Sequence, residues 1–139
     1  MSELLLRKAL LVRDRIGKIR RALPADPEEV ARDERLEAYL AFNLFLLIQD
    51  LVDLAAHLVA ARGLGVPASQ RELFQVLERA AIIAGDTARD MGALASLRNR
   101  IAHSYADLDP VRMAREAPAG LDRAEHFLGE IAAAIAASD

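Results

Sequence analysis

The run of apolar residues from Tyr39 to Ile48 constrains the fold more than any other feature of the sequence. It is interrupted by Asn43 and closed by Gln49 and Asp50, so it falls well short of the roughly 20 apolar residues that a bilayer span needs. A helix that is apolar around most of its circumference must be buried by its neighbours. The run therefore predicts a central helix around which the rest of the chain packs.

The composition indicates that the surrounding elements are helices as well. Hydrophobic residues make up 53% of the chain but aromatic residues only 4%, and alanine and leucine are abundant. This balance favours helices packed through aliphatic side chains over a β-sandwich. A chain of 139 residues is also the size of one ordinary domain. We therefore expect a single all-α domain over residues 1–139.

Helix start and stop signals divide the chain. Pro24 ends an amphipathic first segment, Asp26-Pro27 supplies an N-cap followed by a proline at the first helical position, and Ser69 and Glu72 have capping-box spacing. The expected helices span residues 3–23, 27–62, 70–80 and 85–105, with a short segment after Asp109-Pro110 and a last helix over 120–137. This order predicts an antiparallel bundle of about five to six helices.

Charge and cysteine content narrow the class of function. The net charge of −3 argues against a protein that coats nucleic acid through bulk electrostatics, although it leaves room for a small basic cleft. The absence of cysteine excludes thiol nucleophiles, disulfides and cysteine-based metal sites. Residues 1–8 lack the sustained apolar run of a secretory signal. We therefore expect a cytoplasmic protein that binds neither a membrane nor DNA.

The segment from Leu97 to Tyr105 gathers the most reactive side chains of the chain. Arginine is always charged, histidine exchanges protons near neutral pH, and tyrosine carries a modifiable hydroxyl. At about 100° per residue, one arc of the expected helix is a core stripe and a second arc mixes small and reactive residues. The core stripe consists of Leu94, Leu97, Ile101 and Leu108, and the second arc of Gly92, Ala95, Arg98, Asn99, Ala102 and His103.

The spacing on this second arc leaves two interpretations open. Asn99 and His103 are four apart and could hydrogen-bond, whereas Arg98 and His103 are five apart and need a second copy of the chain to complete a shared site. The other interpretation is structural, because arginine near a helix C-terminus complements the helix dipole and histidine there commonly only hydrogen-bonds. From spacing alone the structural role is the commoner one.

The spacing Arg98-x4-His103-x-Tyr105 resembles the signature of HepT-like toxins, which belong to the HEPN superfamily of helical ribonucleases. The stretch 50–65 and the segment 71–80 are similar to the second and third helices of that family, so the resemblance runs from about Tyr39 to Asp109. It implies a homodimeric, antiparallel HEPN-type bundle that cleaves an RNA substrate in a composite cleft without metal or cofactor. Arg98 would bind the phosphate, His103 would transfer protons and Asn99 would support them.

The resemblance also implies a partner and a means of control. In this family a minimal nucleotidyltransferase antitoxin attaches AMP to the motif tyrosine, here Tyr105, which would make the chain the toxin of a type II toxin–antitoxin system. The alternative is a non-catalytic HEPN subunit that binds a nucleotide or a partner for a nucleotidyltransferase. The intact Arg98, His103 and Tyr105 favour the toxin, because a scaffold does not need all three at this spacing.

Polar residues on the central helix are further candidates. One polar line, within about 40° around that helix, consists of Tyr39, Asn43, Asp50 and His57, and we expect it to line the cleft together with Asp53. Asp53 and His57 also form an i, i+4 pair, which we interpret as an acid that holds a histidine tautomer, not as a metal site. His126, close to Glu125 and Glu130, is expected at the surface.

Overall fold

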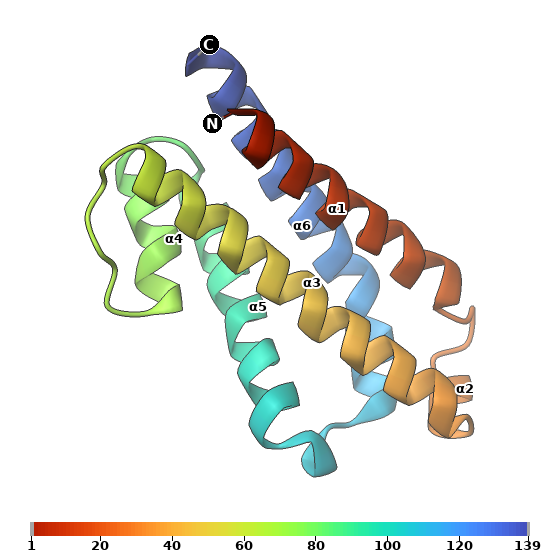
Figure 1. The fold of residues 1–139 in the computed structure, drawn as a ribbon. Helices are drawn as coiled ribbons and strands as arrows, with labels where there is room; N and C mark the ends of the chain where they lie inside the picture. Colours follow the sequence, from red (N-terminus) through yellow and green to blue (C-terminus); the bar gives the residue numbers. More distant parts are fainter. Residues whose placement is uncertain (1, 139) are drawn as a thin grey trace.

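The predicted central helix is α3 (Glu34–Ala61), which packs against all five other α-helices in the described part of the chain. The computed structural model describes residues 2–138, and the ribbon in Figure 1 shows its arrangement. The remaining elements are α1 (Ser2–Ala22), α2 (Glu28–Ala31), α4 (Gln70–Arg79), α5 (Gly85–His103), η1 (Tyr105–Asp107) and α6 (Pro110–Ser138). Within residues 2–138 there is no β-strand, so the all-α prediction is confirmed.

Most of the apolar run lies in the core, as predicted, whereas Tyr39 and Phe42 of the same run are exposed. Leu40, Leu47, Ile48 and Leu51 of α3 are each at most 2% exposed. By length and composition alone α3 could cross a membrane, but half of its most apolar stretch is buried by the other helices. Packing inside the helical bundle accounts for the apolar character of that buried half.

The long helices α1, α3 and α6 form the body of the bundle, and the two chain ends lie close together (Figure 1). α1 packs against both α3 and α6. Arg20 of α1 forms ion pairs with Asp122, at 2.7 Å, and with Glu125, both on α6. The hydrogen bond from Arg20 lowers the pKa of Glu125. These ion pairs connect the C-terminal end of α1 to the middle of α6.

The prediction of one unbroken helix over residues 27–62 is wrong at Arg32 and Asp33. A short α2 ends there and α3 begins, because the Asp33 side chain accepts a hydrogen bond from the backbone N–H of Leu36 at 3.1 Å. Such an N-cap starts a new helix. Val30 of α2 is fully buried, so the break lets this short helix turn its apolar side inward.

The prediction of two separate segments after Asp109 is also wrong, because α6 runs without a break through Pro118. Proline in a helix interior loses one backbone hydrogen bond and strains the preceding turn. Here Pro118 is exposed, whereas Ala117 and Leu121 beside it are buried in the core. Continuous packing along one face of α6 outweighs the local cost of the proline.

The capping box before α4 is confirmed with a small shift. The Ser69 hydroxyl accepts a hydrogen bond from the backbone N–H of Glu72 at 3.0 Å, as expected. The Glu72 carboxylate accepts from the N–H of Ala68 at 2.6 Å, one residue before the predicted donor. α4 then packs firmly against α5 and provides one wall behind the helix that carries the motif.

Candidate active site

The C-terminal end of α5 carries the reactive motif at the surface of the bundle. Ile101 is buried and Leu97 is partly buried against the core, as the helical spacing predicts. Asn99 and His103 are exposed, and Arg98 is half-buried. The core stripe therefore holds the helix in place and the reactive residues project from it.

The small residues expected on the reactive arc have a different role. Gly92 and Ala95 are buried, because the lack of bulky side chains on this arc lets another helix pack closely against α5. A Cβ atom added at Gly92 would lie 3.3 Å from Nη1 of Arg71 on α4. The missing side chain therefore allows α4 to approach α5 closely, one to two turns before the motif.

Arg98 is held by three side chains from two helices. Its Nε donates a hydrogen bond to Oε1 of Gln49 on α3 at 3.0 Å, and its Nη1 donates to Oδ1 of Asn99 at 3.2 Å. Its Cζ lies 4.9 Å from the centroid of the Phe45 ring, a cation–π contact. The predicted hydrogen bond between Asn99 and His103 is not among the interactions within residues 2–138; Asn99 supports Arg98 instead.

Asp53 and His57 lie behind this arrangement on α3. The Asp53 carboxylate accepts a hydrogen bond from Nε2 of Gln49 at 3.1 Å. His57 Nδ1 lies 3.0 Å from the backbone oxygen of Asp53, and because a carbonyl only accepts, Nδ1 carries the proton. The prediction that the acid itself holds the histidine is therefore wrong. Asp53 connects through Gln49 to Arg98.

Asp50 faces another helix. Its carboxylate pairs with Nε of Arg15 on α1 at 3.2 Å, and Nη1 of Arg15 also donates to Asn43 at 3.1 Å. The expected polar line that includes Asn43 and Asp50 thus joins α3 to α1. The structure does not bring Asp50 together with Arg98. Gln49 and Asp50 are consecutive residues, about 100° apart around α3, so Gln49 contacts Arg98 on α5 while Asp50 contacts Arg15 on α1.

Tyr105 lies outside the motif helix. α5 ends at His103 because Ser104 leaves helical geometry, with φ −139° and ψ 35°, and Tyr105 begins the short helix η1. The expected extension of the helix to Tyr105 is therefore wrong by two residues. The ring is 42% exposed. Partial burial raises the pKa of the Tyr105 hydroxyl, and the carboxylates of Glu37 and Glu34 near the start of α3 raise it further.

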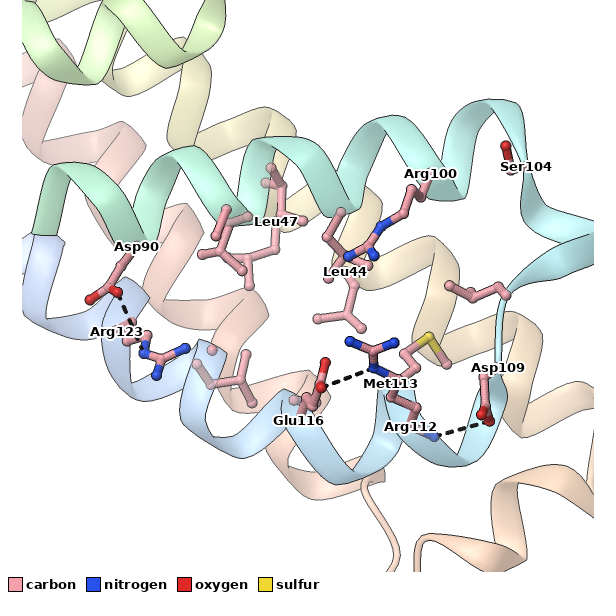
Figure 2. Close-up of a pocket in the computed structure, with 18 of the residues that line it drawn as sticks. Leu44, Leu47, Asp90, Arg100, Ser104, Asp109, Arg112, Met113, Glu116 and Arg123 are labelled. Carbon is pink, nitrogen blue, oxygen red and sulfur yellow. Dashed lines mark hydrogen bonds and ion pairs between the residues drawn. The ribbon is translucent and has the colours of Figure 1, made fainter. Parts of the chain in front are cut away.

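A pocket of about 480 Å³ lies on a different face of α5, between α5 and α6 (Figure 2). Leu44 and Leu47 of α3 contribute to its apolar lining, and Arg100 reaches into the gap from α5. Neither Arg98 nor His103 lines this pocket. The motif therefore lies on an open surface, outside this pocket.

Residues 2–138 contain no group of three or more histidine, cysteine, aspartate or glutamate side chains placed to hold a metal ion. His126, expected at the surface, is 68% exposed and lies 3.3 Å from the Glu130 carboxylate. The side chains that the structure does bring together at the motif are a guanidinium, two amides and an aromatic ring.

Comparison with known proteins identifies the family. The model for the HepT-like ribonucleases matches residues 12–131, a range that includes the whole motif. The chain belongs to the HepT-like ribonuclease family. This HepT-like chain is 24% identical to the mRNA nuclease HepT of Shewanella oneidensis over 109 residues, which cover 78% of this chain and 81% of that protein.

Solved structures share the fold of this HepT-like chain. The tri-AMPylated HEPN toxin of Shewanella oneidensis, in complex with its MNT antitoxin, is 23% identical with a TM-score of 0.86, over 96% of this chain and 99% of that one. A toxin–antitoxin crystal structure with AMP-PNP is 22% identical with a TM-score of 0.86, over 94% and 98%. YutE of Bacillus subtilis, a cytosolic protein, is 16% identical with a TM-score of 0.74, over 91% and 90%. The predicted HEPN-type bundle is confirmed.

Sequence reasoning missed Gln49 and Phe45. Both lie in or directly after the apolar run of α3, where they were interpreted only as part of a buried helix. The signal that was present is Gln49 itself, a polar residue four positions before Asp53 on an otherwise buried helix. Its partner on α5 is 49 residues away in sequence, so only the fold reveals the contact.

Proposed function

We propose that this HepT-like protein is the toxin of a type II toxin–antitoxin pair and acts in the cytoplasm, as a single HEPN-like domain, as an endoribonuclease. Membership of the HepT-like ribonucleases and the likeness to the mRNA nuclease HepT support the activity. One observation carries the assignment of residues. The guanidinium of Arg98 is fixed by α3 at the surface, on the same end of α5 as the exposed His103.

These residues suit metal-independent cleavage of RNA by transesterification. The 2′-oxygen of the substrate attacks the adjacent phosphorus, its proton passes to a base, and the 5′-oxygen of the next nucleotide leaves with a proton from an acid. His103 serves proton transfer, and Arg98 stabilises the negative charge that grows on the phosphorane oxygens. The products carry a 2′,3′-cyclic phosphate and a 5′-hydroxyl. Asn99 supports the reaction through its hydrogen bond with Arg98.

A homodimer completes the site in this proposal. Phe42 of α3 is 61% exposed and Tyr39 is 44% exposed, so both aromatic side chains present apolar surface on this helix. Phe45, on the same helix, lies against Arg98. Exposed apolar surface of this kind marks an interaction site, and a twofold axis through it brings two copies of the motif face to face. The single cleft of the dimer then holds two Arg98 and two His103 side chains, so one histidine accepts a proton while the other donates one.

AMP transfer to Tyr105 by a nucleotidyltransferase antitoxin controls the toxin. The phenol oxygen attacks the α-phosphorus of ATP, pyrophosphate leaves, and the phenol proton passes to a base. A tyrosine hydroxyl is protonated at neutral pH, and the raised pKa of Tyr105 favours the same form, so the antitoxin supplies that base. The product adds a phosphodiester charge at the edge of the motif, where it repels RNA and occupies space. The exposed position of Tyr105 in η1 allows the transfer without unfolding of α5.

Expression in cells without an antitoxin tests the proposal. We expect the wild type to stop growth and to fragment RNA, whereas His103→Ala leaves both intact. His126→Ala is the matched control, because that histidine is exposed on α6 and is expected to leave toxicity unchanged. Normal growth and intact RNA with the folded wild type would contradict the ribonuclease and would favour a non-catalytic binding subunit.

A further inference from the structure

Gln49 lies between Asp53 and Arg98 and contacts both with one amide group. We propose that Gln49 is a positioning residue that fixes which edge of the Arg98 guanidinium meets the scissile phosphate. The inference rests on the proposed ribonuclease function. It assigns a role to a residue of α3 that does not itself touch the reacting atoms.

The amide of Gln49 can hold only one orientation. Its Nε2 donates to Oδ1 of Asp53 at 3.1 Å, and its Oε1 accepts from Nε of Arg98 at 3.0 Å. A carboxylate is acceptor-only and a guanidinium donor-only, so a flipped amide would lose both hydrogen bonds. Asp53 therefore sets the direction of Gln49, and Gln49 sets the direction of Arg98.

These contacts leave a defined edge of Arg98 for a ligand. A guanidinium has five N–H groups: one on Nε and two on each terminal nitrogen. Gln49 occupies the Nε group, Asn99 occupies one Nη1 group, and the Phe45 ring covers one face. Among residues 2–138 no protein acceptor occupies Nη2. The three remaining N–H groups are all on the terminal nitrogens, so Arg98 meets a phosphate end-on through Nη1 and Nη2.

The neutral charge of Gln49 matters as much as its geometry. An amide oxygen anchors the guanidinium but leaves its full positive charge for the substrate. A carboxylate at the same position would hold Arg98 as an ion pair and compete with the phosphate. Asp53 carries the nearest charge along this chain of contacts, and the amide separates it from Arg98. Gln49 therefore holds the Arg98 guanidinium in place without neutralising its positive charge.

Two substitutions separate these effects with a 5′-labelled, mixed-sequence oligoribonucleotide as the probe. Gln49→Leu removes the anchor, and we expect kcat to fall roughly ten- to a hundredfold, as for other losses of alignment, with little change in KM. Gln49→Glu keeps an acceptor but neutralises Arg98, so we expect KM to rise. Gln75→Leu, an exposed glutamine on α4, is the matched control and is expected to match the wild type.

A double-mutant cycle distinguishes positioning from a general structural effect. In the Arg98→Ala background, Gln49→Leu is expected to cause no further loss of cleavage, because the group that it positions is absent. The NMR signal of the Arg98 Nε–H group gives a readout independent of activity. We expect a hydrogen-bonded signal in the wild type and in Gln49→Glu, and its loss in Gln49→Leu.

The outcomes keep this inference apart from the proposed function. A folded wild type that leaves the probe intact contradicts the ribonuclease itself. If Gln49→Leu cleaves the probe as fast as the wild type, only the positioning role is contradicted. Equal fold losses from Gln49→Leu in the wild-type and Arg98→Ala backgrounds would also overturn the role of Gln49, because they would show that it acts independently of Arg98.

Discussion

Glu130 of α6 accepts a hydrogen bond from the Thr87 hydroxyl of α5 at 2.5 Å. The same carboxylate accepts from the backbone N–H of Ala84 at 2.7 Å. Ala84 is the N-cap of α5 and has no side-chain acceptor of its own, so a residue 46 positions later supplies the cap. A negative charge at this end of a helix is also favourable for the helix dipole. α6 therefore fixes the end of α5 that lies opposite the motif.

Glu130→Ala is expected to destabilise the protein by about 1–3 kcal/mol, because it leaves the buried Thr87 hydroxyl and the Ala84 N–H without this acceptor. Urea unfolding measures the change. Glu116→Ala is the control: this residue is exposed on α6 and pairs only at the surface with Arg112, so its loss is expected to cost below about 1 kcal/mol. Equal losses for the two variants would contradict the capping role.

Phe42→Asp is expected to convert a dimer into a folded monomer. The side chain is already 61% exposed, so the substitution costs the isolated protomer little, whereas a charge in an apolar interface opposes association. Sedimentation measures the mass in solution. Leu10→Asp, at a 63% exposed leucine on α1, is the matched control and is expected to remain dimeric. A Phe42→Asp protein that still sediments as a dimer would place the interface elsewhere.

The two tyrosines of the chain provide an internal control for modification. Tyr105→Phe is expected to abolish the AMP adduct seen by intact-mass spectrometry after co-expression with a nucleotidyltransferase antitoxin. Tyr39→Phe is expected to keep it, although Tyr39 is as exposed as Tyr105, at 44% against 42%. Loss of the adduct in Tyr39→Phe, with the adduct kept in Tyr105→Phe, would show that the modified residue is Tyr39 and not Tyr105.

The ion pairs of Arg20 predict how stability depends on pH. Because the pKa of Glu125 is lowered in the folded state, its contribution is fully present above the ordinary glutamate pKa, about 4.3, and is lost as the pH falls through the folded-state value. Both partners are well exposed, so we expect Glu125→Gln to cost below about 1 kcal/mol at neutral pH. Urea unfolding at a series of pH values should show this difference vanish in acid. A constant difference would contradict the pairing.

The sequence was sufficient to predict the architecture because the decisive signals are local. The apolar run of α3 and the Ser69 cap each act within a few residues, and the structure confirms both. The errors have two origins. The N-cap at Asp33 and the end of α5 at Ser104 are local features that were not predicted, whereas the continuity of α6 depends on tertiary packing. The last helix was expected to begin at Gly120, but the packing of Ala117 and Leu121 keeps α6 continuous from Pro110.

The candidate site, too, could be predicted only in part from the sequence. The positions of Arg98 and His103 on one exposed end of a helix follow from helical spacing and were predicted. The partners of Arg98 could not be predicted from helical spacing, because Gln49 lies on another helix and the sequence does not indicate how α3 is rotated against α5. That rotation also directs Asp50 to Arg15 of α1, away from the motif.

Cleavage of a 5′-labelled oligoribonucleotide by the purified protein, in the presence of a metal chelator, tests the central claim most directly. We expect the wild type to release fragments that end in a 2′,3′-cyclic phosphate, and His103→Ala to be about a hundredfold slower or worse, the typical cost of losing a proton-transfer group. Intact RNA with the folded wild type would contradict the assignment of this protein to RNA cleavage, and equal rates for the two proteins would contradict the role of His103.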